Sequence, residues 1–262
     1  MNQETEALPK SLQPEAGSVE IQYFTDPLCC WSWALEPQWR RLRYEFSGLL
    51  RWRYRMAGLI PSWNNYQDPM NDVTKPIQMG PLWLEARYKS GMPIRDDIWF
   101  RDPPASSFPA CIAVKCAGLQ SPVAAENYLR RVREAVMLQG RNIAQWEVLL
   151  EIARELSATQ APLLDFNTFE QQLSGEAARN AFEEDLRQVR LLGISRYPTL
   201  TISLANQPTG VMIVGYRPYE ALVTALLQVA PDLRPLWQAR EEASYSQYWN
   251  GATPREVAEA LS

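Results

Sequence analysis

Two adjacent cysteines open the segment with the clearest chemical potential. Cys29 and Cys30 are followed by Trp31 and Ser32, and they come directly after the tripeptide Asp26-Pro27-Leu28. A thiol placed where a strand passes into a helix meets free backbone N–H groups and the positive end of the helix dipole, both of which stabilise a thiolate. The spacing therefore predicts a catalytic nucleophile at Cys29 that forms mixed disulfides.

Ser32 limits that chemistry. In a Cys-x-x-Cys site the second thiol attacks the mixed disulfide and releases the substrate. Serine stands at this fourth position, so the sequence predicts a monothiol site in which the Ser32 hydroxyl donates a hydrogen bond to the Cys29 thiolate. Cys30 is a candidate resolving thiol, although a disulfide between adjacent residues closes a strained ring. The alternative interpretation of Cys29 is a vestigial cysteine on a scaffold reused for binding.

The composition excludes several other kinds of site. The chain has 262 residues and no histidine, so Ser-His-Asp triads, Cys-His dyads and histidine-containing zinc sites are impossible. The 26 basic and 30 acidic residues give a net charge of −4, which argues against a general nucleic-acid binder. Cys111 and Cys116 lie five residues apart on one expected helix, which favours core packing over a redox pair. We expect no metal site.

Arginines and aromatic residues are interleaved over residues 39–55, with six arginines in that stretch. They could form a phosphate-binding strip. Alternation along a strand explains much of the pattern, with aromatic rings inward and Arg51, Arg53 and Arg55 outward. We therefore favour a solvated charged row.

The elements around the cysteines follow from periodicity. Residues 19–25 alternate as a strand, a helix over about 30–44 contains Pro37, and residues 50–57 alternate again. This β-α-β opening is followed by residues 63–195, which show helical spacing and no strand signal. The closing β-β-α unit has strands at 199–203 and 211–214 and a helix at about 218–229, and a capping box at Thr253 opens a last helix.

This order of elements divides the chain. We predict an α/β protein with a discontinuous β-α-β/β-β-α domain over 19–62 and 196–230. A helical insert domain over 63–195 separates its halves, and 231–262 forms a C-terminal helical extension. Residues 1–18 are polar, with neither a signal peptide nor structure expected. No apolar stretch reaches the roughly 18 residues of a membrane span, so we expect a cytoplasmic protein that does not bind membranes.

Three of these segments resemble the DsbA family of the thioredoxin superfamily. The active-site segment Asp26–Trp33 with Pro37 after it, the Tyr197-Pro198 loop, and Ser106–Ala110 carry the resemblance. They are similar to the cytoplasmic FrnE-like oxidoreductases and to the adaptor proteins that deliver the regulator Spx to a Clp protease. The resemblance implies a thioredoxin fold with a large helical insertion between its β-α-β and β-β-α halves.

The resemblance also implies roles for particular residues. Pro198 is expected to be cis and to face Cys29, with Tyr197 aligning the substrate backbone. Ser107 belongs to the helix that lines the cleft, and Trp31 and Trp33 are expected to form an apolar docking surface.

Three functions follow as alternatives. The first is a monothiol disulfide oxidoreductase acting on protein thiols or disulfides. The second is a non-catalytic adaptor that binds a client protein through the same cleft. The third is a glutathione-dependent transferase or isomerase of the kappa or hydroxychromene-carboxylate isomerase type. No cofactor is expected apart from glutathione, and no nucleic acid is expected as a partner.

Overall fold

A four-stranded mixed sheet forms the centre of the protein in the computed structural model, which describes residues 19–159, 163–205, 207, 209–238, 241–249 and 251–262. The predicted disordered segment 1–18 lies outside the described residues. The strand order is β2-β1-β3-β4; β1 and β2 are parallel, and the other neighbouring pairs are antiparallel. The strands are β1 (Val19–Thr25), β2 (Leu50–Met56), β3 (Thr199–Leu204) and β4 (Gly210–Val214).

One face of the sheet carries a hydrophobic core. Ile21 and Tyr23 of β1 and Ile202 of β3 point into this core and are fully buried. The predicted alternation of β2 is also present, because Trp52 packs against this core while Arg51 and Arg53 are exposed. Arg51 and Arg53 thus form the charged row expected from strand alternation, but Arg55 does not belong to it, because its side chain is 12% exposed and pairs with the buried Asp185 at 2.9 Å.

The helix predicted after β1 is interrupted and forms two helices. The first, α1, spans Cys30–Ala34, and the second, α2, spans Glu36–Glu45. Pro37 occupies the first turn of α2. Proline has no N–H to continue the helical hydrogen bonds and its ring collides with the preceding turn, so it is accepted at a helix start and breaks a helix interior.

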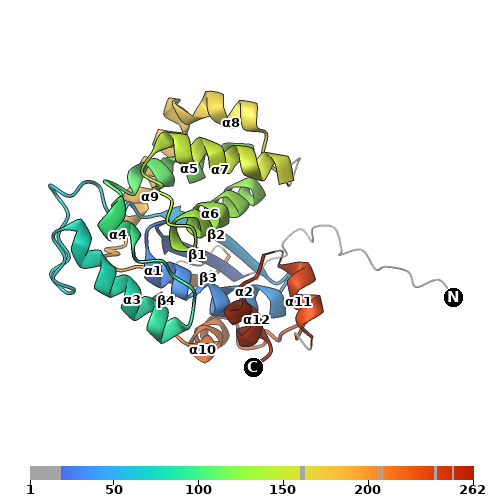
Figure 1. Cartoon of the computed structure of the whole chain (residues 1–262). Helices are drawn as coiled ribbons and strands as arrows, with labels where there is room; N and C mark the ends of the chain where they lie inside the picture. The colour runs from blue at the N-terminus through green and yellow to red at the C-terminus, as the bar shows by residue number, and fades with distance from the viewer. Residues whose placement is uncertain (1–18, 160–162, 206, 208, 239–240, 250) are drawn as a thin grey trace.

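The segment between β2 and β3 is helical, as predicted, and stands on one side of the sheet in Figure 1. Within its described part, the only β-bridge pairs Asp68 with Val73. Its helices pack around a core that also includes Cys30 and Trp33 of α1 and Met56 of β2. They are α3 (Met79–Ser90), α4 (Ile98–Arg101), α5 (Phe108–Gln120), α6 (Pro122–Met137), α7 (Trp146–Thr159), α8 (Phe166–Leu173) and α9 (Glu176–Leu191), with a 3₁₀ turn at Pro76–Gln78.

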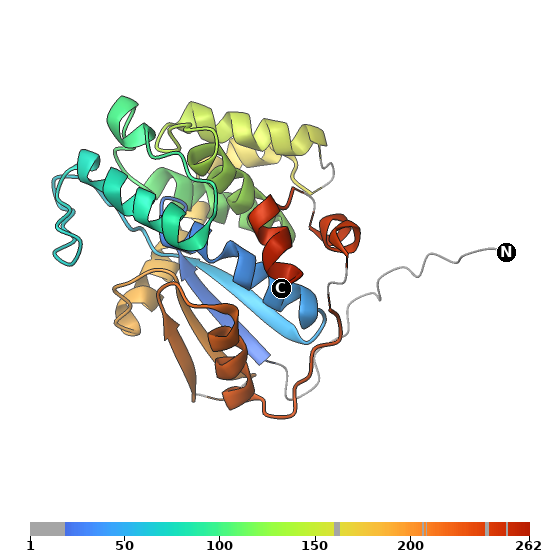
Figure 2. The ribbon, with the colours of Figure 1, turned by 60° about the horizontal axis from the view of Figure 1, so that its bottom comes forward.

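Three helices close the chain: α10 (Tyr219–Val229), α11 (Glu242–Tyr248) and α12 (Pro254–Ala260). Helix α10 covers β3 and β4, and α12 packs against α2 (Figure 2). The capping box predicted at Thr253 is confirmed, because the Thr253 hydroxyl accepts from the Glu256 N–H while the Glu256 carboxylate accepts from the Thr253 N–H. Across the described residues, every helix is too short or too polar to cross a membrane.

Candidate functional site

Cys29 is the N-cap residue of α1, at the position the sequence predicts. Its Sγ accepts a hydrogen bond from the Ser32 backbone N–H at 3.4 Å, but the residue is only 5% exposed. Burial raises the pKa of the Cys29 thiol above its ordinary value of about 9, and the nearby Ser32 groups offset only part of this effect. The direction of this pKa is opposite to the stabilised thiolate that the sequence predicts, because burial disfavours the charged form of the thiol.

Ser32 and Cys30 were expected to assist Cys29, and the structure places them on different sides of it. The Ser32 hydroxyl is buried, and the Cys29 Sγ accepts from the Ser32 backbone N–H at 3.4 Å. Both the side chain and the backbone N–H of Ser32 lower the pKa of Cys29, so the predicted donation from the hydroxyl stays a prediction. The Cys30 Sγ instead points to the Leu82 carbonyl of α3, at 4.0 Å. All four cysteines are buried and free. No second thiol is set up to resolve a mixed disulfide on Cys29.

The raised pKa predicts a specific reactivity of Cys29. Iodoacetamide reacts with the thiolate, so we expect the alkylation rate of Cys29 to keep rising with pH beyond about 9. Mass spectrometry of peptides from a limiting reaction, repeated across a pH series, measures this profile. Cys111 provides the internal control, because it is fully buried and its pKa is raised well above 9. A plateau of Cys29 labelling below pH 7 would contradict the expected profile.

The Tyr197-Pro198 loop lies next to this motif. The peptide bond is cis, as the resemblance implied. Pro198 is buried and Tyr197 is half-buried. Burial raises the pKa of Tyr197, and its side chain packs against Phe24 at the end of β1 and Ala57 just after β2.

Two predicted contact residues lie inside the protein. Trp33 is fully buried and donates its indole N–H to the Pro93 carbonyl at 3.0 Å. Ser107 is also fully buried, and its hydroxyl donates to Asp26 Oδ2 at 2.8 Å and accepts from the Ile60 N–H. A substrate or client therefore cannot touch either side chain in this conformation. Of the two tryptophans, only Trp31 reaches the surface.

Asp26 joins three segments beneath the motif, a role that was not predicted from the sequence. Its buried carboxylate accepts from the backbone N–H groups of Leu28 and Leu59, at 2.8 and 2.7 Å, and from the Ser107 hydroxyl. The Cys111 thiol also contacts it at 3.3 Å. Burial raises the pKa of Asp26 despite these donors. A carboxylate directly after an apolar strand was the available signal for this role.

A small aromatic and basic surface lies beside Cys29. The Trp31 ring lies 6.0 Å from the Tyr216 ring, and Lys89 Nζ lies 5.8 Å from the Trp31 ring. Gln38 donates to the Tyr216 hydroxyl at 3.2 Å. We call Trp31, Tyr216 and Lys89 the Trp31 surface; it combines α1, α3 and the β4–α10 loop, which are far apart in the sequence.

A buried ion network lies on the inner side of α2. Arg133 of α6 contacts Glu36 at 2.5 Å and also donates to the Thr25 hydroxyl at the end of β1. Its positive charge lowers the pKa of Cys29, although less than burial raises it. Arg130 bridges Glu36, at 3.5 Å, to Glu256 of α12, at 2.9 Å. The network therefore connects the C-terminal extension to the floor of the cysteine site.

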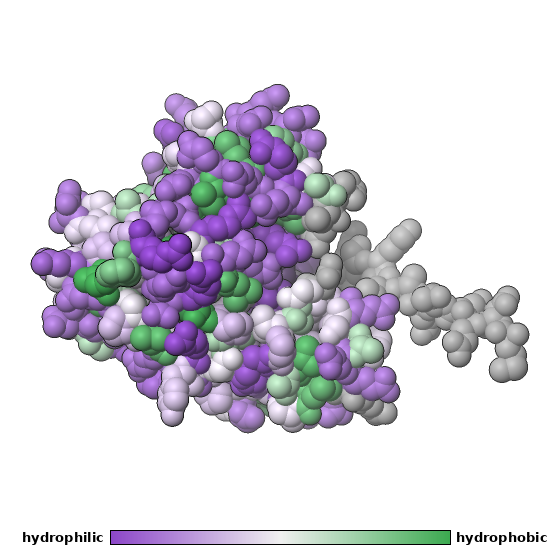
Figure 3. Space-filling view, in the orientation of Figure 1, coloured by the Kyte–Doolittle hydropathy of each residue, from purple (hydrophilic) through white to green (hydrophobic). Residues whose placement is uncertain are grey.

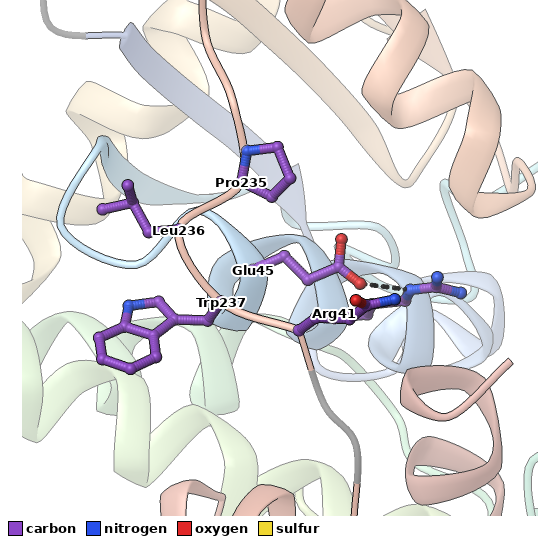
Figure 4. Close-up of a pocket in the computed structure, with 6 residues that line it drawn as sticks. Arg41, Glu45, Pro235, Leu236 and Trp237 are labelled. Atoms are coloured by element: carbon purple, nitrogen blue, oxygen red, sulfur yellow. Dashed lines mark hydrogen bonds and ion pairs between the residues drawn. The ribbon is translucent and has the colours of Figure 1, made fainter.

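A cavity of about 550 Å³ lies away from the cysteines, at the C-terminal end of α2. Arg41 and Glu45 pair there at 2.9 Å, and the Glu45 carbonyl accepts from the N–H groups of Leu236 and Trp237 (Figure 4). The Trp237 ring points away from the ion pair. Among the described residues, no cluster of cysteine and acidic side chains is placed to hold a metal ion.

Known proteins share this architecture. A family model described as thioredoxin matches residues 23–224. A protein of Halalkalibacterium halodurans named ClpXP adapter protein SpxH is 29% identical over 227 residues, which cover 85% of this chain and 72% of the relative.

Two solved structures have the same fold. A putative protein disulfide isomerase from Nitrosomonas europaea superposes with a TM-score of 0.63 at 21% identity, covering 82% of this chain and 96% of that one. The cytosolic disulfide reductase DsbM from Pseudomonas aeruginosa, solved with GSH, gives 0.56 at 22% identity and covers 80% and 99%. At these identities the two structures show the fold alone, a thioredoxin fold with a helical insertion.

Proposed function

The chain belongs to the DsbA-like branch of the thioredoxin superfamily, and on that basis we propose that it is a protein-binding adaptor rather than a disulfide-exchanging enzyme. The observation that carries the proposal is the state of the thiols. Cys29 is buried with a raised pKa, Ser32 replaces the resolving thiol, and Cys30 points to α3. Disulfide exchange needs an accessible thiolate and a thiol that releases the product.

The name of the 29% identical relative indicates the kind of adaptor. We propose that this chain, like that relative, serves the protease ClpXP by presenting a client protein to it. The resemblance to adaptors that deliver Spx makes an Spx protein the first client to test. This assignment needs a docking surface but no redox cycle, which matches the thiols described above.

The Trp31 surface is the proposed client-binding site. A half-buried tryptophan fixed between a tyrosine and a lysine supplies rigid contact area, and such residues dominate binding energies at protein interfaces. The face shown in Figure 3 is mostly hydrophilic, with hydrophobic residues in small separate groups. A compact anchor such as Trp31 can hold a client without a broad apolar interface.

The test is client degradation by purified ClpXP. With ClpXP and Spx of Halalkalibacterium halodurans, we expect the chain to accelerate the loss of Spx. Trp31→Ala should reduce this acceleration about tenfold or more, as for a central interface tryptophan. Cys29→Ser should retain it within about twofold, since a buried thiol forms no essential bond in this proposal.

The matched control is Trp146→Ala. Trp146 is a second surface tryptophan, at the start of α7, and is 38% exposed. This variant should act like the wild type. No acceleration by the wild type would exclude the adaptor assignment for this client. An equal loss in both tryptophan variants would exclude the Trp31 surface as its binding site.

A monothiol reaction at Cys29 is the second candidate. It is favoured by one observation, the Ser32 N–H donated to the Cys29 Sγ at the start of α1, because a hydrogen bond to sulfur stabilises a thiolate. In this alternative the Cys29 thiolate attacks the disulfide of oxidised glutathione, of a glutathionylated protein or of a protein substrate; a new S–S bond to Cys29 forms, the old S–S bond breaks, and the second sulfur leaves as a thiolate. Alkylation of Cys29 that reaches its plateau below pH 7, with turnover of a glutathione mixed disulfide, would favour it over the adaptor.

A further inference from the structure

Strand β4 has backbone groups that no neighbouring strand uses. The Gly215 N–H donates to the Pro198 carbonyl at 2.7 Å, which places a hydrogen-bonded pair just beyond the end of the β3–β4 ladder. Such pairs recur at every second residue of an antiparallel ladder. Val211 and Ile213 therefore form backbone hydrogen bonds with β3. The alternate residues direct theirs away from the sheet; these are Gly210, Met212 and Val214.

This edge is open among the described residues. None of their hydrogen bonds uses the outward N–H and C=O groups of β4. Figure 2 shows β4 as the outermost strand on its side of the sheet. The Met212 side chain is 46% exposed. An unpaired edge of this kind is a template for another strand.

Charge distinguishes the two outer edges of the sheet. β2 carries three arginines, at positions 51, 53 and 55, and like charges oppose the pairing of a strand with its own copy. β4 has the sequence Gly-Val-Met-Ile-Val, without a charged residue or a proline. Natural edge strands usually carry such residues to prevent pairing. Their absence makes β4 the edge that tolerates an identical partner.

We propose that β4 pairs with β4 of a second copy of this chain, antiparallel and about a two-fold axis through Met212. In this register Met212 faces its own equivalent, and Gly210 of each copy faces Val214 of the other. The outward-facing residues stand at the centre of the five-residue strand and at both of its ends. A two-fold axis through the central residue therefore places each outward N–H of one copy opposite an outward carbonyl group of the other. The interface is isologous, so it closes as a dimer.

Sedimentation of the full chain tests the dimer, at concentrations from about 2 to about 200 µM. We expect the mass to approach that of two chains at the upper end. Met212→Pro should raise the dissociation constant about tenfold or more, because it removes the outward N–H and places a ring at the two-fold axis. The Met212 N–H makes no hydrogen bond to β3, so the proline substitution removes no hydrogen bond between β3 and β4. The control, Met212→Ala, keeps the outward N–H, so its dissociation constant should stay within about threefold of the wild-type value.

Amide exchange of the wild-type chain locates the interface even if the proline variant does not fold. The amides of Met212 and Val214 should exchange about tenfold more slowly at high than at low concentration. Those of Val211 and Ile213 should be protected at both concentrations, since they bond to β3.

Several outcomes would overturn the proposal. A single-chain mass throughout the concentration range would exclude the dimer. A dimer that persists in Met212→Pro, or that leaves the Met212 and Val214 amides unprotected, would place the interface elsewhere. Protection of these amides only after addition of Spx to a monomeric chain would show that the edge binds a client strand instead of a second copy. The proposed adaptor function would stand or fall separately, by the degradation assay.

Discussion

Replacing Arg133 with methionine is expected to lower the free energy of unfolding by about 3 kcal/mol, which corresponds to a fall in melting temperature of roughly 8 °C for a chain of this size. The Arg133 guanidinium is buried and bonds both Glu36 and Thr25. Its removal leaves the Glu36 carboxylate in the interior with only the longer contacts to Arg40 and Arg130, each 3.5 Å. Chemical denaturation of the two proteins measures the difference.

The neighbouring arginine provides the control for that experiment. Arg131 lies on the same helix and pairs with Glu134, but its side chain is 39% exposed. Arg131→Met should change the free energy of unfolding by less than about 1 kcal/mol, as expected for an exposed pair. The double variant Glu36→Gln/Arg133→Met should recover part of the loss, because both charges are then absent. Equal losses for the two single arginine variants would contradict the buried network.

Glu256→Gln is expected to cost about 2 kcal/mol at neutral pH and progressively less in acid. Burial alone would raise the pKa of Glu256, but the charges of Arg130 and Arg40 outweigh it and hold that pKa below its ordinary 4.5. The native state therefore binds this proton less tightly than the unfolded chain does. The stability that the carboxylate contributes is present above about pH 4.5 and is lost as the pH falls through the native pKa.

Denaturation of wild type and Glu256→Gln at several pH values measures this prediction. The two curves of stability against pH should begin to approach each other below about pH 4.5 and meet once the pH falls below the native pKa of Glu256, because the protonated glutamate then resembles glutamine. Glu85→Gln, which breaks an exposed pair with Lys89, is the control and should differ from wild type by less than about 0.5 kcal/mol. A difference between wild type and Glu256→Gln that stays constant with pH would show that Glu256 acts through packing and not through charge.

Both predictions concern the C-terminal extension as well as the site. Glu256 anchors α12 to Arg40 of α2, at 3.2 Å, and to Arg130 of α6. The sequence indicates a capped helix here but gives no reason for it to pack on α2. The network supplies that reason, because a buried carboxylate needs opposite charges around it. The extension is therefore part of the folded unit that carries Cys29.

The sequence by itself determined the order of the elements and the position of the nucleophile candidate. Alternation in β1 and β2, the capping residue Thr253, and the absence of strand patterns over 63–195 are local signals, because periodicity and caps depend on near neighbours in the chain. Cys29 follows β1 and caps α1, as the motif required. Even the break that Pro37 causes is a local effect, although it forms a second helix and not a kink.

Only the tertiary structure decided what those residues can do. The pKa of Cys29 is raised by burial, and the burial of Trp33 and Ser107 depends on segments far away in the sequence. The role of Asp26 likewise arises from donors on the β2–α3 connection and on α5. A one-dimensional pattern specifies which groups are present near the start of a helix. Desolvation and ion pairing are properties of the three-dimensional neighbourhood, and here they changed a predicted reactive thiolate into a buried thiol.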